Sequence, residues 1–207
     1  MSARISWDRY FVNITRDVGE RSTCDRRHIG AVITNVSHEI VATGYNGNPR
    51  GMSHCATIGC IRNELNIPSG TRTEICTAVH AEQNALLQAG RASFGGTLYC
   101  AVQPCNVCAK MIINAGIRRV VYLDPYPETM GVDLMVALGL EVERYYLEED
   151  RVERITTFQQ SLGAEDSLQR AKEAAAGVGG KPLRIYDSLA NLGTAPQVRR
   201  EGNQGGS

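Results

Sequence analysis

Three strand-like runs alternate with two helical segments in the second half of the chain, and this order constrains the fold more than any other feature. The runs are GTLYCAV (96–102), RRVVYL (118–123) and EVERYYL (141–147), and the helical patterns extend from Pro104 to about Ala115 and over roughly 128–138. A strand, a helix and a parallel strand in succession form a right-handed crossover. The sequence therefore predicts an α/β domain with helices on both faces of a sheet.

A helix and a hairpin precede these crossovers. Apolar residues recur with a helical period in SWDRYFVNITRDVGERS (6–22), and IGAVITN (29–35) and IVATGYN (40–46) predict an antiparallel hairpin. We expect a three-layer α/β/α sandwich with a mixed sheet of roughly five strands, in a domain spanning 1–150. Residues 151–207 begin charged and Ala-rich and end with Gly-Gly pairs, which predicts a C-terminal helix and a poorly ordered tail.

The charge balance bears on the partners. The chain has 22 Lys and Arg residues against 22 Asp and Glu residues, whereas nucleic-acid-binding domains usually carry a basic face. This balance favours a small-molecule partner over nucleic acid. No apolar run approaches the ~20 residues of a membrane span, and the start MSARISWDRYF lacks the apolar stretch of a secretion signal. We therefore expect a cytoplasmic protein without a membrane partner.

Seven cysteines in a reducing compartment point to a metal site or to catalysis rather than to disulfides. Cys105 and Cys108 follow Pro104, which suits the first turn of a helix. Thiols three residues apart share a helix face, and the positive end of the helix dipole favours their ionised form. The spacing alone is also typical of a redox pair or of two core cysteines.

His80 and Glu82 lie in TAVHAEQNALLQAG (77–90), which predicts a helix. Residues two apart do not share a face inside a helix, so both reach one point only if the helix begins there. His80, Cys105 and Cys108 would then leave the fourth position of a catalytic zinc ion open to water. Glu82 beside the metal can move the proton of that water. H-x-E followed by P-C-x-x-C is a known signature of zinc nucleobase deaminases.

Over about residues 5–147 the chain resembles the deoxycytidylate (dCMP) deaminases, in particular the bacterial and phage branch that includes late-competence-operon deaminase-like proteins. The resemblance rests on ISWDRYF, RSTCDRRHIGAVI, GYNGNPRG, HAEQNALLQAG, LYCAVQPCNVCAKMIINAGI and VVYLDPY. It implies a cytidine-deaminase-like fold and zinc-dependent hydrolysis of dCMP to dUMP and ammonia, with Glu82 as the catalytic acid and base. The alternatives are a deaminase of another cytosine nucleotide or of a tRNA base, and a non-catalytic assembly protein that retains zinc.

The resemblance also implies roles for residues outside the zinc motif. Those implied to contact the substrate are Asn46, Ala81, Tyr122 and Tyr126. A turn position explains the asparagine equally well, and packing under a loop explains the tyrosines. The loop that contains Gly44, Tyr45 and Gly47 matches the region where relatives bind regulatory dCTP or dTTP with Mg²⁺. Relatives are often hexamers, so we expect a homo-oligomer.

Four cysteines fall outside the motif: Cys24, Cys55, Cys60 and Cys76. Three of them lie in or at the end of the segment 47–76, which is rich in Gly, Pro, Asn and Cys and has no helical or strand period. Four thiolates around a second, structural zinc would supply the stabilisation that packing does not. Scattered thiols are the alternative, and His28 or His54 can take the place of one cysteine. Cys100 alternates along a predicted strand and is expected in the core.

Overall fold

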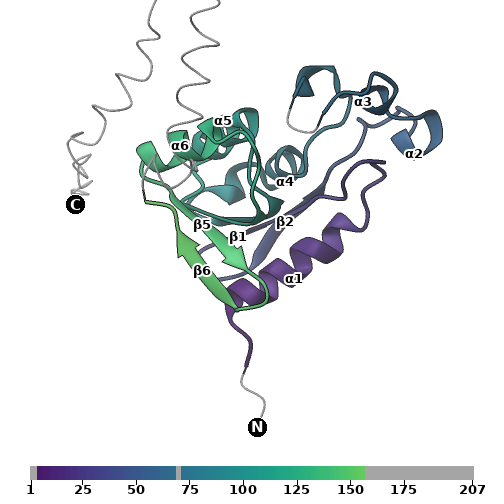
Figure 1. The fold of residues 1–207 in the computed structure, drawn as a ribbon. Helices are drawn as coiled ribbons and strands as arrows, with labels where there is room; N and C mark the ends of the chain where they lie inside the picture. The colour runs from purple at the N-terminus through teal and green to yellow at the C-terminus, as the bar shows by residue number, and fades with distance from the viewer. Residues whose placement is uncertain (1–3, 69–70, 157–207) are drawn as a thin grey trace, which may run out of the picture. The chain divides into compact units, whose positions relative to one another are not determined.

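A six-stranded sheet with the order β2-β1-β3-β4-β5-β6 organises the part of the chain that the computed structural model describes, residues 4–68 and 71–156 (Figure 1). Its strands are β1 (Gly30–Thr34), β2 (Ile40–Tyr45), β3 (Thr97–Val102), β4 (Arg119–Asp124), β5 (Glu141–Tyr146) and β6 (Arg151–Arg154). β3, β4 and β5 are parallel, and the other pairings are antiparallel. The predicted mixed sheet is confirmed, with one strand more than expected.

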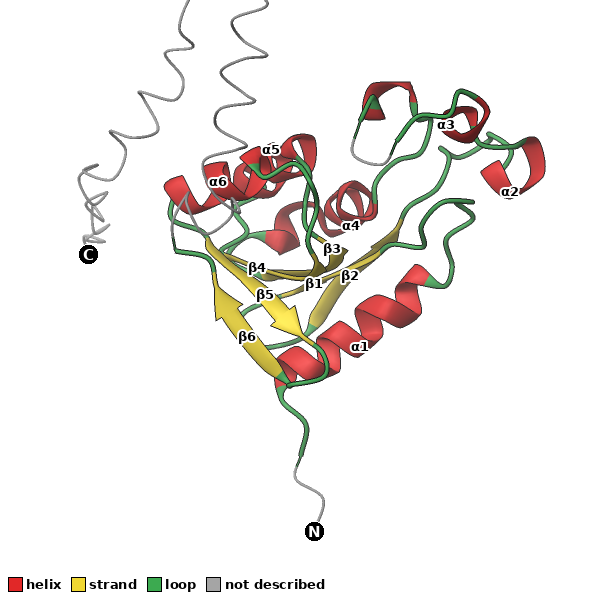
Figure 2. Ribbon diagram, viewed as in Figure 1, coloured by secondary structure: helices red, strands yellow, loops and turns green. Residues whose placement is uncertain are grey.

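Helices cover both faces of this sheet (Figure 2). On one face lies α1 (Trp7–Gly19), and on the other lie α4 (Ala81–Ala89), α5 (Asn106–Asn114) and α6 (Met130–Ala137). The predicted three-layer α/β/α sandwich is therefore confirmed. The remaining helical pieces are single turns: α2 (Cys55–Ile58), α3 (Ile61–Glu64), and 3₁₀ turns at Thr73–Ile75 and Gly90–Ser93. The segment that lacked a sequence period thus has little regular structure.

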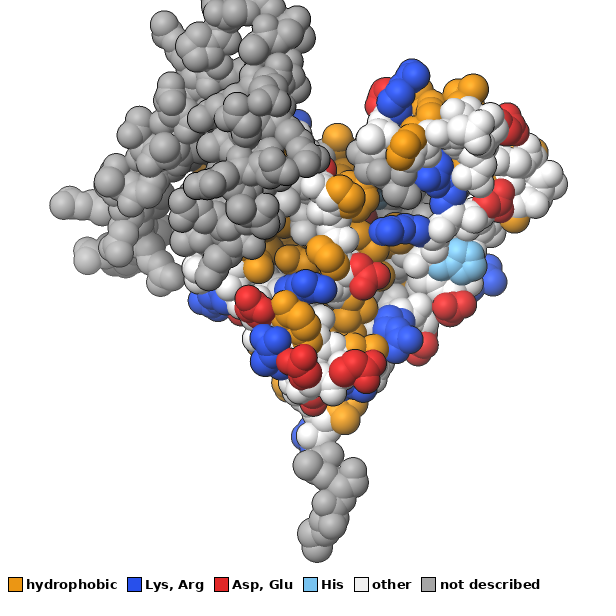
Figure 3. Space-filling view, viewed as in Figure 1, with side chains coloured by type: hydrophobic (Ala, Val, Ile, Leu, Met, Phe, Trp, Pro, Cys, Tyr) orange, Lys and Arg blue, Asp and Glu red, His pale blue; other side chains and the backbone are white. Residues whose placement is uncertain are grey.

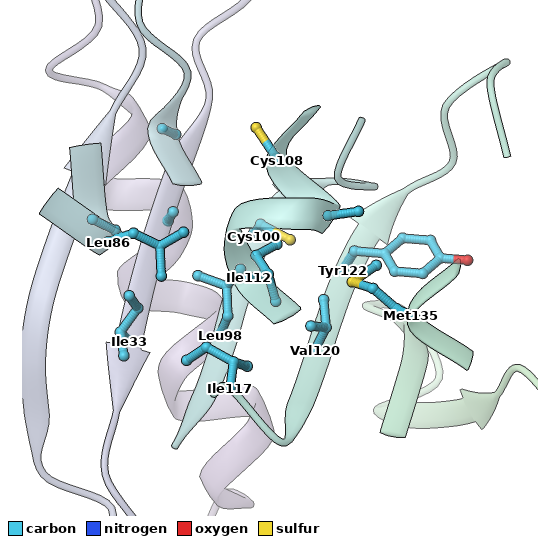
Figure 4. Packing of buried hydrophobic residues seen from close by; sticks show 14 of the residues in the cluster. Ile33, Leu86, Leu98, Cys100, Cys108, Ile112, Ile117, Val120, Tyr122 and Met135 are labelled. Atoms are coloured by element: carbon cyan, nitrogen blue, oxygen red, sulfur yellow. The ribbon is translucent and has the colours of Figure 1, made fainter. Parts of the chain in front are cut away.

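The central strands are buried on both faces because their side chains alternate between two cores. Leu98 and Val120 point toward α4–α6 and pack against Ile112 (Figure 4), whereas Tyr99 and Val121 point toward α1. Successive strand residues face opposite sides of a sheet, so a strand between two helical layers is apolar throughout. These two cores hold the carboxyl ends of the parallel strands in place beside the N-termini of α4 and α5.

A network of charged side chains fastens α1 to three strands. The Arg119 guanidinium contacts both carboxylate oxygens of Asp8 at 2.6 and 2.9 Å and donates to Glu143 at 2.5 and 2.8 Å. The Tyr99 hydroxyl donates to Asp8 at 2.8 Å. Burial raises the pKa of Asp8, but its hydrogen bonds and the Arg119 charge more than offset burial, so this pKa is lowered from 3.8.

The sixth strand corrects the expectation for the C-terminal part. Arg151–Arg154 pair with β5 as an antiparallel strand rather than starting a helix. The Arg154 side chain forms ion pairs with Glu141 and Glu143 across this pair, which explains how so polar a stretch becomes a strand. The predicted boundary at residue 150 therefore falls inside the sheet. Residues 157–207 lie outside the described part, so the C-terminal helix and tail stay predictions.

Membrane insertion receives no support from the described helices. None of them is both long enough and apolar enough to span a bilayer.

Candidate active site

His80 is the N-cap residue of α4, with extended backbone angles of −72° and 157°. Its N–H donates to the side-chain oxygen of Gln83 at 2.9 Å, which fixes the first turn. Since the helix begins after His80, the rule that separates positions i and i+2 inside a helix does not apply. His80 and Glu82 both line one cavity at this helix end, as the sequence predicted.

Cys105 occupies the equivalent place on α5. It is the N-cap residue, with backbone angles of −71° and 168°, and Cys108 follows in the first turn. Pro104 precedes the cap instead of lying in the first turn, because Cys105 is still extended. The Glu128 carboxylate accepts a hydrogen bond from the Asn106 N–H at 3.0 Å, so an anion stabilises the positive end of this helix.

The three predicted zinc ligands meet between these two helix ends. The His80 Nδ1 lies 3.4 Å from the Cys108 Sγ and 3.6 Å from the Cys105 Sγ, and all three ligand atoms lie within 4.8 Å of one another. Tetrahedral zinc, with bonds of about 2.3 Å to sulfur and 2.0–2.1 Å to nitrogen, requires nitrogen and sulfur about 3.6 Å apart. The donor set and its spacing therefore fit zinc.

The ionisable groups of the cluster influence one another strongly. A hydrogen bond from Cys108 lowers the pKa of Cys105 to about 4, while burial opposes the shift. The same hydrogen bond and burial raise the pKa of Cys108. Because a metal ion binds the deprotonated form of cysteine, metal binding would release the protons that remain on these two sulfurs. Burial also raises the pKa of the Glu82 carboxyl, which is 4% exposed.

The cavity has a volume of about 110 Å³. Asn46, Ala81 and Tyr126 line it, as predicted for substrate contacts. Tyr122 does not line it: the side chain packs in the core near Met135 (Figure 4), because its position along β4 directs it beneath α6. The predicted substrate contact of Tyr122 is therefore not supported by its placement.

Asn46 has a structural task at the rim of the cavity. Its side-chain oxygen accepts the Ile29 N–H at 2.9 Å, and its Nδ2 donates to the Arg27 carbonyl at 2.9 Å. The amide thus holds the chain segment before β1 against the cavity. This placement favours a positioning role.

The glycines of the predicted regulatory loop bring the hairpin close to α4. A Cβ on Gly44 would lie 2.2 Å from the Ala81 oxygen and 2.4 Å from the Ala85 nitrogen. Gly47 pairs with Val79 through two backbone hydrogen bonds of 2.9 and 3.2 Å. The Tyr45 carbonyl accepts a hydrogen bond from a side chain of α4. The loop is therefore joined directly to the helix start that carries His80, and nucleotide binding by it stays a prediction.

The four cysteines outside the motif also line the cavity: Cys24, Cys55, Cys60 and Cys76. Burial raises the pKa of Cys55, and the charges of the other three raise it further, so the four are neighbours. No three of their sulfurs lie within 4.8 Å of one another in the described residues. His28 and His54 are exposed and do not line the cavity.

The sequence reasoning missed several cavity residues. Arg26, Arg27, Arg62 and Gln103 line the cavity. Gln103 fixes the loop after β4, since its amide donates to the Glu128 carbonyl at 2.9 Å and accepts the Tyr126 N–H at 3.4 Å. The position of Gln103 directly before Pro104 and the zinc motif could have identified it from the sequence. Arg62 lies in a segment without a period, where no signal existed.

Comparisons with known proteins agree with this geometry. Residues 5–124 match the family described as "Cytidine and deoxycytidylate deaminase zinc-binding region". The deoxycytidylate deaminase of Schizosaccharomyces pombe is 37% identical over 152 residues, which cover 72% of this chain and 47% of the relative. That of Mycobacterium phage D29 is 40% identical over 126 residues, covering 58% of this chain and 96% of the relative. This chain thus spans about half the length of the yeast relative.

A solved structure has the same fold. The dCMP deaminase of cyanophage S-TIM5, determined in complex with dCMP and dUMP, superposes with a TM-score of 0.55 and 28% sequence identity. The match covers 69% of this chain and 99% of the phage protein.

Proposed function

Because this chain belongs to the cytidine and deoxycytidylate deaminase family, we propose that it hydrolyses dCMP to dUMP and ammonia in a zinc-dependent reaction. One observation carries the proposal: a buried carboxylate, Glu82, shares a small cavity with a His-Cys-Cys cluster that fits zinc. A structural zinc site does not need an uncoordinated carboxylate beside it, whereas hydrolysis needs a group that moves protons.

We assign the chemistry to a few groups of the chain. His80, Cys105 and Cys108 would hold a zinc ion, which would supply Lewis-acid chemistry by lowering the pKa of a water to about 7. Glu82 takes a proton from the water that attacks C4 of the cytosine ring. It delivers this proton to N3. It then takes the remaining proton from the new hydroxyl group on C4 and delivers it to the amino group, which leaves as ammonia while the C4 carbonyl forms. Water and dCMP are thereby converted to dUMP and ammonia.

Burial suits Glu82 to this task. A raised pKa brings a carboxyl group closer to neutral pH, where it both accepts and returns a proton readily. The walls around the carboxylate also keep bulk water from competing for the proton.

The test is a spectrophotometric assay of the zinc-loaded protein with dCMP, CMP, dCTP and deoxycytidine, since loss of the amino group changes the ultraviolet absorbance. We expect the highest kcat/KM for dCMP. A higher kcat/KM for another cytosine nucleotide would show that this nucleotide, and not dCMP, is the substrate. No turnover of any of the four, with zinc bound, would replace the proposal with a non-catalytic role.

We propose in addition that Cys24, Cys55, Cys60 and Cys76 hold a second, structural zinc. Their common position in the lining of one cavity supports this, as does the scarcity of regular structure in the segment 47–76. The sulfurs would have to move closer together around the ion. Two zinc ions per chain, falling to one in Cys55→Ser, are the expected result of elemental analysis. One zinc per chain that Cys55→Ser leaves unchanged would end this proposal.

Regulation and assembly stay predictions from the family resemblance. They comprise activation by dCTP, inhibition by dTTP, a magnesium ion bound with the triphosphate, and a hexamer. The close junction of the loop at Gly44 and Gly47 with α4 supports a route by which a bound effector would act on His80. We place the protein in the cytoplasm, where its seven free cysteines stay reduced.

A further inference from the structure

The cavity beside the zinc ligands carries an excess of positive side chains. Arg26, Arg27 and Arg62 line it, and Glu82 is the one carboxylate among the described residues that do so. On the face of the molecule shown in Figure 3, basic and acidic side chains are interspersed. Three arginines in the lining of one small cavity point to an anionic group on the ligand.

Arg62 is held in place by hydrogen bonds to backbone carbonyls. Its Nη2 donates to the carbonyls of Pro68 and Thr71, each at 2.8 Å. Its Nε is buried and has no hydrogen-bond partner within the described part of the chain. Backbone carbonyls fix the guanidinium but carry no net charge, so the positive charge remains available. A buried N–H without a partner is uncommon, and a bound ligand is one way to satisfy it.

Arg27 and Arg62 come from different elements but lie near the same tyrosine. Burial raises the pKa of Tyr126, and the charges of Arg62 and then Arg27 partly offset that rise. Arg62 belongs to α3, Arg27 to the segment before β1 and Tyr126 to the loop after β4. Three separate parts of the chain therefore meet at one side of the cavity.

The size of the cavity decides which part of a nucleotide reaches these arginines. Pockets that enclose whole drug-sized ligands measure roughly 300–1,000 Å³, whereas this cavity has about 110 Å³. It accommodates a single ring next to Glu82. The sugar and its substituents must then lie at the rim.

We infer that Arg62, together with Arg27, binds the 5′-phosphate of the substrate and selects nucleoside monophosphates over nucleosides. The inference rests on the proposed deaminase function and adds the residues that distinguish dCMP from deoxycytidine. A planar guanidinium offers paired N–H donors that match phosphate oxygens. The backbone bonds of Arg62 hold it ready, so little side-chain freedom is lost on binding.

The decisive experiment compares dCMP with deoxycytidine in the zinc-loaded full chain. Arg62→Met and Arg27→Met should each lower kcat/KM for dCMP, by about 10- to 100-fold for a lost charge-assisted hydrogen bond. The change should be in KM, because the phosphate is remote from the reacting atoms. The kcat/KM for deoxycytidine should fall by less than about threefold. Arg62→Lys keeps the charge but loses the paired donors. Its kcat/KM for dCMP should therefore lie between those of the wild type and Arg62→Met.

A matched control comes from the same irregular segment. Arg72 pairs with Glu74 at 3.4 Å, its side chain is 64% exposed, and it does not line the cavity. Arg72→Met should leave kcat/KM unchanged for both dCMP and deoxycytidine. If Arg62→Met and Arg27→Met lower kcat/KM equally for dCMP and deoxycytidine, the arginines only support the fold and the inference is overturned.

Titration calorimetry with dCMP and deoxycytidine separates this inference from the proposed function. Binding of dCMP that depends on Arg62, without turnover, would refute the deaminase assignment and leave the phosphate subsite standing. Turnover of dCMP with an unchanged preference in both variants would overturn the subsite alone. Binding of neither ligand by the wild-type protein would refute both.

Discussion

The Nδ1 atom of His80 lies 3.4 Å from the Sγ atom of Cys108, although the two residues are 28 positions apart. Each lies at the start of a helix that packs on the same face of the sheet. The spacing that zinc requires is therefore set by how α4 and α5 dock on the strands.

Removal of one ligand should remove one metal ion. We expect Cys108→Ala to lower the zinc content by one ion per chain and to abolish deamination, because two ligands hold zinc poorly. Elemental analysis of purified protein measures this. Cys100→Ala is the matched control: Cys100 is also buried, on β3, but is not part of the ligand group, so it should keep the metal. Full zinc content in Cys108→Ala would refute the ligand assignment.

Glu82→Gln should separate metal binding from catalysis. The amide has nearly the same shape but cannot accept the proton, so we expect normal zinc content and a loss of about 10²–10⁴-fold in kcat. Zinc analysis and the absorbance assay on the same preparation measure both. Turnover close to that of the wild type would contradict the role of Glu82 as proton carrier.

Gly44→Ala should disturb the active site from a distance. The new Cβ would lie 2.2 Å from the Ala81 oxygen, so α4 must shift, and overpacking of this kind costs about 1–3 kcal/mol. We expect a lower melting temperature and weaker zinc retention during dialysis against a chelator. Gly47→Ala is the control, since its nearest neighbour would be the Thr23 Oγ1 at 3.7 Å. Equal effects of the two substitutions would contradict this account.

The Asp8–Arg119 pair should make stability depend on pH in the acid range. The pKa of Asp8 is lowered below 3.8 in the folded protein, so the unfolded chain binds the proton first as the pH falls. Asp8 therefore stabilises the fold above about pH 4, and this contribution is lost as the pH drops through the folded pKa. We expect Asp8→Asn to cost about 1–3 kcal/mol at neutral pH and to flatten the acid part of the curve.

Urea unfolding between pH 2.5 and 7 measures this dependence. Glu149→Gln, which removes an exposed partner of Arg151, should leave the unfolding free energy unchanged. An acid dependence as steep in Asp8→Asn as in the wild type would show that other groups cause it.

The parts of the fold that local patterns control were predictable from the sequence. The buried central strands, the hairpin and the starts of α4 and α5 follow from hydrophobic periods and motif spacing. β6 was not predictable, because its charged side chains have no strand period and it is stabilised by pairing with β5. The contact expected of Tyr122 came from the family resemblance, which does not show that its side chain packs in the core near Met135. The place of Arg62 in the cavity was not predictable either, because it lies in a segment without a helical or strand period.

The cavity has two kinds of wall with different tolerance for sequence change. The helix ends that carry the zinc ligands and Glu82 pack on buried strands. Loss or gain of a single methyl group there destabilises the close-packed core. Much of the remaining lining comes from residues 47–76, whose described part contains two four-residue helices and a 3₁₀ turn. Beyond Gly47, which pairs with Val79, we expect replacements in this segment to displace the reacting centre less than replacements in the strands. Substrate preference can thus diverge during evolution while the chemical step is inherited intact.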